Sequence, residues 1–418
     1  MILHRLYIGG MRKLLIIAAL SISGQPLMAQ VKILFDATKA EMAGNADWVI
    51  DADQTNIRFG PNAYLSTSGN QSNPQRVPTP AQSGITTGTP ETYWTGALSS
   101  WAVDCVNRGY TVETLPYNGQ ITYGNTANPQ DLANYNVYVV DEPNITFTSA
   151  EKTAMMRFVQ NGGGLFMIAD HNVSDRNGDG WDSPHVWNDF LSTNSVQPYP
   201  FGIYFDTVDF SQTTTNISAT STDSIIHGPM GNVAKVKYSG GTTMTLNPTL
   251  NPSVKGVVYK TGSTTANVNA MVAYARFGNG KVAAMGDSSP SDDSTGNPGC
   301  TLYNGYWTDA GGNHRLLLMN ITIWLATRPP STSVGQINGN AGIRLYPNPA
   351  KEVAQLQSEI NLTNVMLAVY DITGRMVMQT TLPQLDQNQK YTINAPKGMY
   401  YVKVMADQTN ATLKLIVE

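Results

Sequence analysis

The stretch NVYVVDEPNITFTSAEKTAMMRFVQNGGGLFMIAD, residues 136–170, decides the fold of the larger part of this chain. It begins with the apolar run 136–141 and ends with the apolar run 165–170, and both runs have the length of a buried strand. Between them, TSAE at 148–151 is a capping box that starts a helix, and the glycines at 162–164 stop it. Two strands that are apolar on both faces and joined by a helix predict neighbouring parallel strands in a sheet covered on both sides.

The same alternation of strands and helices continues on either side of this unit. Apolar runs at 32–36 and 281–287 predict two more strands, and apolar residues at helical spacing predict helices near 98–108 and 313–326. Residues 195–275 are instead rich in threonine and tyrosine and predict a strand-rich insertion. The expected fold class of the domain at 30–327 is therefore α/β, with a mostly parallel sheet.

The first 29 residues have the pattern of an export signal. MRK at 11–13 is basic, residues 14–22 are apolar, and Ala29 is a small residue suited to cleavage. The apolar run is too short to span a bilayer and no later segment is long and apolar enough, so we expect a signal peptide at 1–29 and no membrane span. A buried N-terminal helix is the alternative.

Composition narrows the function further. Only 13% of the residues are charged and the net charge is -4, so no basic stripe is available for phosphates and nucleic-acid binding is not expected. We also expect neither a nucleotide nor an organic cofactor. The two cysteines, Cys105 and Cys300, are too few for a disulfide framework, and Cys105 is expected to be a small buried hydrophobe on the apolar face of a helix.

The C-terminal part is a separate domain. Prolines and serines break the chain after the last predicted helix, so we expect a linker at 328–340. After it, residues 341–418 alternate short strands with turns and predict a small all-β sandwich.

This C-terminal segment resembles the type A C-terminal sorting domain of the type IX secretion system of Bacteroidetes. The motifs that carry the resemblance are LYPNPA at 345–350, VYDITGR at 369–375, KGMYYV at 397–402 and the terminal KLIVE at 414–418. The resemblance implies the type IX secretion machinery as a partner, and export through the periplasm and outer membrane to a secreted or cell-surface location. A generic β-sandwich module is the alternative.

Four of the predicted strands end in aspartate: Asp36, Asp141, Asp170 and Asp287. Ligands of an open parallel sheet bind outside the carboxyl ends of its strands, so these aspartates converge on one rim if the four strands are neighbours. Clustered carboxylates either take up protons, with raised pKa values, or hold a cation. Because His171 follows Asp170 directly, we predict a catalytic rim in which His171 or a carboxylate is the general base. The alternative is that each aspartate only caps the next turn or helix.

The acidic stretch ADHNVSDRNGDGWDS, residues 169–183, contains the candidate cation ligands. Asp175, Asn177 and Asp179 match the first half of a calcium-loop pattern, but valine occupies the twelfth position, where a bidentate glutamate is required. Asp182 or Asp189 could replace that glutamate, and we predict a divalent cation, with calcium favoured, on Asp175, Asn177, Asp179 and Asp182. The alternative is a glycine-rich turn held by hydrogen bonds from its side chains to its own backbone.

Ser288 is the remaining catalytic candidate, because it follows the strand that ends in Asp287. It could act as a nucleophile with His171 or His314 as its base. The block GDS at 286–288 is similar to that of GDSL hydrolases, but it lies late in the chain and the family's later Asp-x-x-His is missing, so membership is not expected. A turn cap is the alternative role.

The large domain resembles the class I glutamine amidotransferase-like superfamily, in particular its ThuA-like and GIFT-type branches that are not amidotransferases. The segments that carry the resemblance are ILFD at 33–36, NGGGLF at 161–166, HGP at 227–229, GKVAAMGD at 280–287 and IWLA at 323–326. The resemblance implies a flavodoxin-like sheet. Neither cysteine lies in a strand-to-helix elbow, so glutamine hydrolysis is not expected, and the superfamily contains both enzymes and binding domains.

Two functions follow from these features. The first is a secreted hydrolase that acts on an extracellular polymer, with carbohydrate favoured because aromatic residues expected near the rim could stack on sugar rings. These residues are Trp181, Trp187, Tyr204 and Trp307. The second is a non-catalytic module that binds a glycan or a cell surface and is stiffened by calcium.

Overall fold

The structure of the chain is a computed structural model. It describes residues 30–43, 46–51, 81–90, 93–295, 303–307, 311–327, 343–359, 361–386, 390–406 and 409–418. The predicted signal peptide, the predicted linker and Cys300 lie outside these ranges. The chain divides into two compact units, Met1–Ala326 and Thr327–Glu418, which are described separately.

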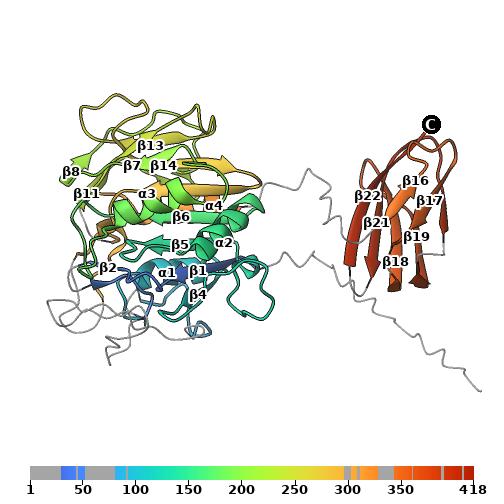
Figure 1. The fold of residues 1–418 in the computed structure, drawn as a ribbon, viewed down its shortest axis with the longest axis horizontal. Coiled ribbons are helices and arrows are strands. Elements are labelled where there is room, and N and C mark those ends of the chain that lie inside the picture. The colour runs from blue at the N-terminus through green and yellow to red at the C-terminus, as the bar shows by residue number, and fades with distance from the viewer. Residues whose placement is uncertain are drawn as a thin grey trace, which may run out of the picture. The chain divides into compact units, whose positions relative to one another are not determined.

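One nine-stranded sheet forms the centre of the larger unit (Figure 1). Its strands are β1 (Lys32–Asp36), β4 (Thr111–Leu115), β5 (Val137–Asp141), β6 (Gly164–Ile168), β7 (Ile203–Phe205), β12 (Met244–Leu246), β13 (Lys255–Tyr259), β14 (Ala270–Phe277) and β15 (Gly280–Met285). Five of them run parallel in the order β4-β1-β5-β6-β15. Antiparallel strands β14, β12 and β7 continue the sheet beyond β15, and β13 pairs with β14. The four strands that carry the predicted aspartates are therefore neighbours.

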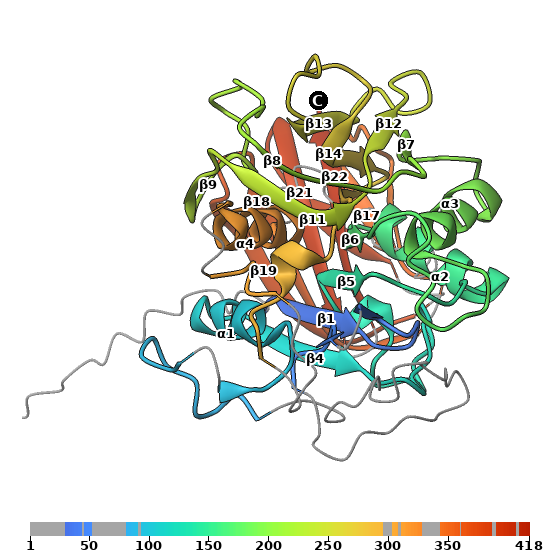
Figure 2. The same cartoon turned by 90° about the vertical axis from the view of Figure 1, so that its left-hand side faces the viewer.

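Helices cover both faces of this sheet (Figure 2). Helices α1 (Ser99–Asn107) and α4 (His314–Ala326) pack on one face, which we call the α1–α4 face. Helices α2 (Ser149–Gln160) and α3 (Ser183–Thr193) pack on the other, the α2–α3 face. The predicted capping box opens α2, because Thr148 and Glu151 each accept the other's backbone N–H.

Side chains of the parallel strands alternate between two apolar cores. Phe35 and Val139 belong to the core under the α1–α4 face, whereas Leu34 and Tyr138 belong to the core under the α2–α3 face. Every residue of β5 and β6 is buried, as expected for strands covered on both sides. Burial on both faces explains why these strands are continuous apolar runs and not alternating ones.

The strand-rich region at 195–275 is confirmed. It supplies β7, β12, β13 and most of β14 to the main sheet, and so extends the parallel core with antiparallel strands. Short strand pairs complete this unit: β8 (Phe210–Thr214) with β11 (Val236–Gly241), β9 (His227–Gly228) with β10 (Gly231–Asn232), and β2 (Met42–Ala43) with β3 (Ala46–Asp47). The predicted α/β fold with a mostly parallel core is thus confirmed.

The smaller unit is an all-β sandwich, as predicted. Its strands are β16 (Arg344–Tyr346), β17 (Val353–Gln357), β18 (Leu362–Asp371), β19 (Met376–Leu385), β20 (Tyr391–Asn394), β21 (Gly398–Ala406) and β22 (Thr409–Val417). One antiparallel sheet has the order β16-β17-β20 and the other β19-β18-β21-β22. Fully buried side chains such as Leu356, Leu367 and Val402 form its core.

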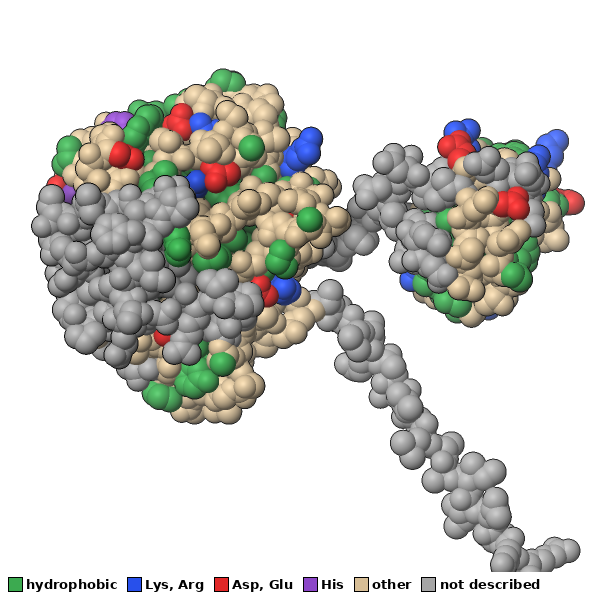
Figure 3. Space-filling model, turned by 60° about the horizontal axis from the view of Figure 1, so that its bottom comes forward, with side chains coloured by type: hydrophobic (Ala, Val, Ile, Leu, Met, Phe, Trp, Pro, Cys, Tyr) green, Lys and Arg blue, Asp and Glu red, His purple; other side chains and the backbone are tan. Residues whose placement is uncertain are grey.

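Three further expectations concern the packing of Cys105, membrane-spanning helices and the distribution of charged side chains on the surface. Cys105 is buried in α1, with its Sγ 3.8 Å from Met319 Sδ, which confirms its packing role. Among the helices of the described ranges, none has the length and hydropathy that a membrane span requires. On the face drawn in Figure 3, acidic and basic side chains are scattered among uncharged ones.

Candidate active site

The strand ends bring three of the four predicted aspartates together and leave the fourth apart. Asp141, Asp170 and Asp287 each lie two residues after a side chain of the core under the α1–α4 face, so strand alternation turns them to that face. The three preceding residues are Val139, Ile168 and Met285. Asp36 lies two residues after Leu34 and points to the α2–α3 face. The prediction of a single rim is therefore wrong for Asp36.

Asp36 belongs to a separate buried pair with Glu41. Its carboxylate accepts from the backbone N–H and the hydroxyl of Thr38, at 3.3 and 3.2 Å. Burial raises the pKa of Asp36, and burial together with the charge of Asp36 raises the pKa of Glu41 well above its usual range. Lys39 on this face is ion-paired with Glu151, with Nζ 2.8 Å from Oε1.

On the other face lies what we call the rim cluster, which comprises Asp141, Glu142, Asp170, Arg176 and Asp287; its arginine links two of the acidic side chains. Arg176 Nε donates to Glu142 Oε1 at 2.9 Å, and Arg176 Nη2 donates to Asp170 Oδ2 at 2.6 Å. The guanidinium therefore bridges the ends of β5 and β6. Hydrogen bonds between two charged groups are roughly twice as strong as neutral ones, so this bridge fixes the geometry of the cluster.

Glu142 is the centre of the rim cluster. It is fully buried, and its backbone lies in the left-handed region with φ +52°. Its second oxygen, Oε2, accepts from Ser288 Oγ at 2.6 Å and from Trp48 Nε1 at 2.8 Å. A left-handed backbone at a residue other than glycine costs on the order of 1–3 kcal/mol and persists only where surrounding contacts enforce it. Here Arg176, Ser288 and Trp48 supply those contacts.

Asp287 is buried beside Glu142 and exchanges its proton near neutral pH. Burial raises its pKa to about 7, and the charge of Glu142 acts in the same direction. The backbone N–H groups of Ser239 and Ser289 donate to its two oxygens at 2.5 and 2.8 Å and limit the rise in pKa.

The pKa values of Asp170 and Asp141 are also raised, like that of Asp287. Burial and the charges of Glu142 and Asp287 raise the pKa of Asp170 well above its usual range, although Arg176 opposes them. Burial likewise raises the pKa of Asp141, whose Oδ2 accepts from Ser291 Oγ at 2.6 Å while Oδ1 has no hydrogen-bond partner among the described atoms. A neutral carboxyl group loses less hydration free energy on burial than a carboxylate, so a protonated Asp141 is consistent with an Oδ1 that accepts no hydrogen bond.

His171 lies on the solvent side of the rim cluster, with 21% of its side chain exposed. Its Nδ1 is 2.6 Å from the carbonyl oxygen of Asn172, and a carbonyl can only accept, so Nδ1 carries the hydrogen. In the neutral ring Nε2 is then a base, and it lies 3.5 Å from Asp170 Oδ2. Gly240, with φ +87°, allows this close approach, because a Cβ there would lie 3.2 Å from His171 Cδ2.

Ser288 does not form the predicted pair with a histidine. Its hydroxyl donates to Glu142, and its side chain is buried. His314 is also buried, and both ring nitrogens bond to backbone: Nδ1 is 2.9 Å from Gly305 O, and Nε2 accepts from Lys237 N at 3.0 Å. Ser288 therefore orients Glu142, and His314 anchors the start of α4.

The predicted cation loop is folded on itself by hydrogen bonds. Asp175 accepts from the N–H groups of Gly178 and Gly180 at 2.7 and 2.8 Å. Asp179 accepts from Asn177 Nδ2 at 2.9 Å and from Trp181 N at 2.9 Å. These are the bonds of the alternative interpretation, a glycine-rich turn.

Asp182 is separate from that turn, because it caps α3. Its side chain accepts from His185 N at 3.1 Å and from Val173 N at 2.7 Å. Within the part of the chain that the structure describes, no three acidic, histidine or cysteine side chains are grouped so that they could hold a metal ion. Calcium on this loop stays a prediction.

The predicted aromatic residues differ in their exposure. Trp187 is fully buried between the sheet and α3, where its Nε1 donates to Ile168 O at 2.8 Å, so it cannot stack on a ligand. Trp181 and Tyr204 are 37% and 40% exposed. Trp307 packs against the guanidinium of Arg315, 4.4 Å from the ring centroid.

Four residues near the site were not predicted: Trp48, Arg176, Ser239 and Tyr303. Arg176 had a signal, since it is the one lysine or arginine in the acidic stretch 169–183. Tyr303 is 39% exposed, and burial followed by the charges of Asp287 and Asp170 raises its pKa. Trp48 had no signal, because 94 positions separate it from Glu142.

Comparison with known proteins identifies the smaller unit. Residues 344–418 match the family described as the secretion system C-terminal sorting domain, which confirms the predicted sorting domain. The domain marks the chain for the type IX secretion machinery and for export to the cell surface or the extracellular space. No curated protein was found to match the chain.

Solved structures give only distant likenesses to the chain. The N-terminal domain of mmIFT52 is 13% identical over 71% of this chain and 97% of that chain, with a TM-score of 0.40. A ThuA-like protein from Parabacteroides merdae is 11% identical over 71% and 90%, with a TM-score of 0.34. Latent PorU from Porphyromonas gingivalis is 22% identical over 18% and 9%, with a TM-score of 0.15. The amidotransferase-like resemblance therefore stays a prediction.

Proposed function

We propose that the larger unit is a secreted hydrolase of an extracellular polymer and that the rim cluster with His171 is its active site. The observation that carries this proposal is the bridge of Arg176 between Glu142 and Asp170, beside a histidine whose Nε2 lies 3.5 Å from Asp170. The cluster lies at the carboxyl ends of neighbouring parallel strands, where ligands of open α/β sheets bind. The sorting domain supports an extracellular substrate.

We assign the roles of general acid and general base to Asp170 and His171 according to which of the two carries a proton. Asp170, whose raised pKa favours the acid form, donates its proton to the leaving oxygen. His171 Nε2, the basic nitrogen of the neutral ring, takes a proton from the attacking water. The water oxygen bonds to the scissile carbon as the bond from that carbon to the leaving oxygen breaks. The proton then passes from His171 back to Asp170, which restores both groups.

The remaining members of the rim cluster position this pair. Arg176 holds Asp170 in place and keeps positive charge beside it, while Ser288 and Trp48 hold Glu142. Asp287, with a pKa of about 7, is a second proton store near neutral pH.

Carbohydrate is the substrate class that we favour. Trp181 lies in the loop after β6, and Tyr303 is close enough to respond to the charges of the rim cluster. Both keep more than a third of their surface exposed. Such rings offer a flat apolar face with a polar tip, which suits a sugar ring and its hydroxyl groups.

A panel of extracellular polysaccharides tests this proposal, with released reducing ends as the readout. We expect the exported chain to hydrolyse at least one polymer and the His171→Gln variant to lose at least about 100-fold in kcat, the usual contribution of a general base. Absence of turnover on every polymer, or an unchanged kcat in His171→Gln, would contradict the proposal.

The second candidate is a non-catalytic module that binds a glycan or a cell surface. The loop 175–181 favours it, because its side-chain bonds give it a fixed shape that presents Trp181 to solvent. Calcium at Asp175, Asn177 and Asp179 would stiffen it further. Metal analysis of the purified chain and its melting temperature with and without a chelator test this candidate. A calcium-dependent rise in melting temperature without any turnover would favour it over the hydrolase.

A further inference from the structure

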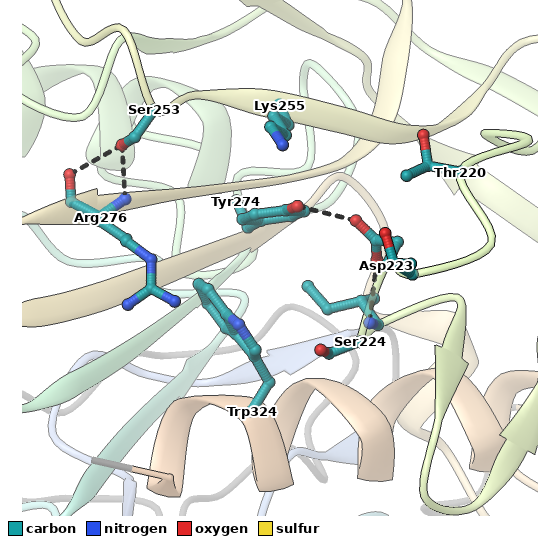
Figure 4. A pocket seen from close by; sticks show the side chains of 10 residues that line it. Thr220, Asp223, Ser224, Ser253, Lys255, Tyr274, Arg276 and Trp324 are labelled. Atoms are coloured by element: carbon teal, nitrogen blue, oxygen red, sulfur yellow. Dashed lines mark hydrogen bonds between the residues drawn. The ribbon is translucent and has the colours of Figure 1, made fainter. Parts of the chain in front are cut away.

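A second hollow lies far from the rim cluster in the larger unit (Figure 4). Its volume is about 420 Å³, within the range of small-molecule sites, and it is formed by β13, β14, the end of α4 and residues 220–225. Along β15, the strand residues that pair with Tyr274 and Arg276 are Ala283 and Lys281, whereas the rim cluster follows Met285. The hollow therefore opens toward the opposite end of β15.

Two aromatic side chains form the floor of this hollow. The rings of Tyr274 and Trp324 meet edge to face, with centroids 4.9 Å apart. The Tyr274 hydroxyl donates to Asp223 at 2.7 Å, and Asp223 also accepts from the N–H groups of Ile225 and Ile226. The floor is thus held in one conformation, and the charge of Asp223 is spread over three donors.

Two cationic side chains line the hollow: in Figure 4, Lys255 lies above Tyr274, and the guanidinium of Arg276 lies beside Trp324. Lys255 and Arg276 are both exposed, and neither forms an ion pair with an acidic residue among those that the structure describes. Arg276 is fixed at its backbone, because its N–H donates to Ser253 Oγ at 2.8 Å, and its guanidinium carbon is 5.8 Å from the Trp324 centroid.

A third cation shows that positive charge accumulates here. Lys281 lies against Trp324, with Nζ 4.9 Å from the ring centroid and 2.5 Å from the carbonyl oxygen of Trp324. Burial, followed by the charge of Arg276, lowers the pKa of Lys281 to about 8. Asp223 is the one acidic side chain that lines the hollow, and it is already hydrogen-bonded, so the cations Lys255 and Arg276 outnumber it and favour an anionic ligand.

We infer that this hollow binds one acidic sugar residue of a polysaccharide, a uronate or a sulfated sugar. The carboxylate or sulfate lies between Lys255 and Arg276, where charge-assisted hydrogen bonds form. The sugar ring lies over Trp324 and Tyr274. Its hydroxyls reach the exposed side chains of Thr222 and Ser224 at the rim of the hollow. The inference stands on its own geometry and does not require the rim cluster to be catalytic.

Titration calorimetry on the full exported chain at low salt tests this inference. The probes are tetragalacturonate, a heparin-derived tetrasaccharide, the neutral cellotetraose and sodium sulfate. We expect one of the two anionic tetrasaccharides to bind at least about tenfold more tightly than cellotetraose and than sulfate alone, because charge and ring contacts act together. The tighter of the two identifies whether the acidic group is a carboxylate or a sulfate.

Matched variants separate the hollow from general charge effects. The double variant Lys255→Gln with Arg276→Gln should lose at least about tenfold in affinity, since two charge-assisted contacts are removed. The control, Arg157→Gln with Lys403→Gln, removes two exposed cations elsewhere and should stay within about twofold. Trp324→Phe should weaken binding while it keeps an aromatic floor.

Four results would overturn the inference. They are no binding of either anionic tetrasaccharide, equal binding of cellotetraose, equal binding of sulfate alone, and equal losses in the double variant and its control. Because the readout is binding and Asp170 lies outside the hollow, a failed hydrolase proposal leaves this test intact.

Discussion

One edge of a single sheet carries two buried acidic groups that are built in opposite ways. On the α1–α4 face, Arg176 bridges Glu142 and Asp170 directly, with hydrogen bonds of 2.9 and 2.6 Å. On the α2–α3 face, no arginine or lysine of the described ranges bridges Asp36 and Glu41, and burial raises the pKa of both. The first group opens to solvent through His171, which is 21% exposed, whereas Asp36 and Glu41 are almost fully enclosed.

This difference distinguishes the proposed active site, the rim cluster, from the enclosed Asp36–Glu41 pair, to which we assign a structural role. A buried carboxylate is expensive unless it is paired or protonated. The rim cluster combines an arginine bridge with raised pKa values at Asp170 and Asp287, whereas the Asp36–Glu41 pair shows raised pKa values alone. Pairing with an arginine keeps charge inside the fold, together with a strained backbone at Glu142 (φ +52°), and charge that is kept in place can act on a ligand. The raised pKa values of Asp36 and Glu41 favour uptake of a proton, which lowers the charge of this enclosed pair.

The largest expected effect on folding comes from removing the bridge. Arg176→Met leaves Glu142 and Asp170 buried without their cation, so the free energy of unfolding at pH 8 should fall by about 3–5 kcal/mol. Urea unfolding measures this effect. Arg157→Met, which removes an exposed arginine from α2, is the matched control and should change stability by less than about 0.5 kcal/mol. Equal losses in the two variants would show that the bridge has no special role.

The second-largest effect is a dependence of the free energy of unfolding on pH, caused by Asp287. Asp287 has a pKa of about 7 in the folded chain, above its value of 3.8 in the unfolded chain, so the folded state binds the proton more tightly. Its contribution to stability is complete below pH 4 and is lost as the pH rises through 7. Between pH 5 and pH 8 it should lower the free energy of unfolding by about 2–3 kcal/mol.

The variant Asp287→Asn should reduce this pH dependence of urea unfolding by that amount, while the raised pKa values of Asp141 and Asp170 maintain the remaining slope. Asp179→Asn changes an exposed aspartate of the acidic loop and should leave the slope as in the natural chain. A natural chain that is equally stable at pH 5 and pH 8 would mean that Asp287 is not held in its protonated form.

A smaller effect is expected on the other face of the sheet. Asp36→Asn replaces an acid with a raised pKa by a neutral side chain, so the unfolding free energy should rise by about 1 kcal/mol at pH 8 and change little at pH 5. Thermal unfolding at the two pH values measures this. A loss of several kcal/mol at pH 8 would instead mean that the Asp36 carboxylate is a paired charge, like Glu142.

The smallest effect tests the backbone. Val173 has φ +61°, as unfavourable as that of Glu142, but its side chain is 75% exposed and only its N–H is held, by Asp182. Val173→Gly should therefore raise the free energy of unfolding by about 0.5–1 kcal/mol, because glycine adopts this backbone without strain. Chemical denaturation measures the change, and destabilisation by this substitution would show that the valine side chain has a contact that matters.

The sequence predicted the strands of this edge better than the direction of their side chains. The apolar runs that end at Asp36, Asp141, Asp170 and Asp287 gave the four strands and made their adjacency a testable assumption, which is confirmed. Strands buried on both faces carry no polar–apolar alternation, so the sequence could not show that Asp36 faces away from the other three. Only the membership of Leu34 and Val139 in different cores reveals it.

Sequence patterns could not predict which residues from distant parts of the chain contact the rim cluster. Arg176 was visible in the acidic stretch, but its reach to Glu142 depends on how the loop folds back over β5. Trp48 and Ser239 contact the cluster from distant segments, and no local pattern marks them. The calcium-loop pattern was ambiguous for a related reason, since the same oxygens can bind a cation or the backbone amides of a turn.

The most direct test compares turnover in Asp170→Asn and Asp36→Asn on a polymer that the natural chain hydrolyses. Both variants remove one buried aspartate at the same edge of the sheet. We expect Asp170→Asn to lose at least about 100-fold in kcat with polymer binding retained, and Asp36→Asn to stay within about twofold. Equal activity in the two variants, or an equal loss in both, would contradict the claim that the rim cluster alone is the catalytic site.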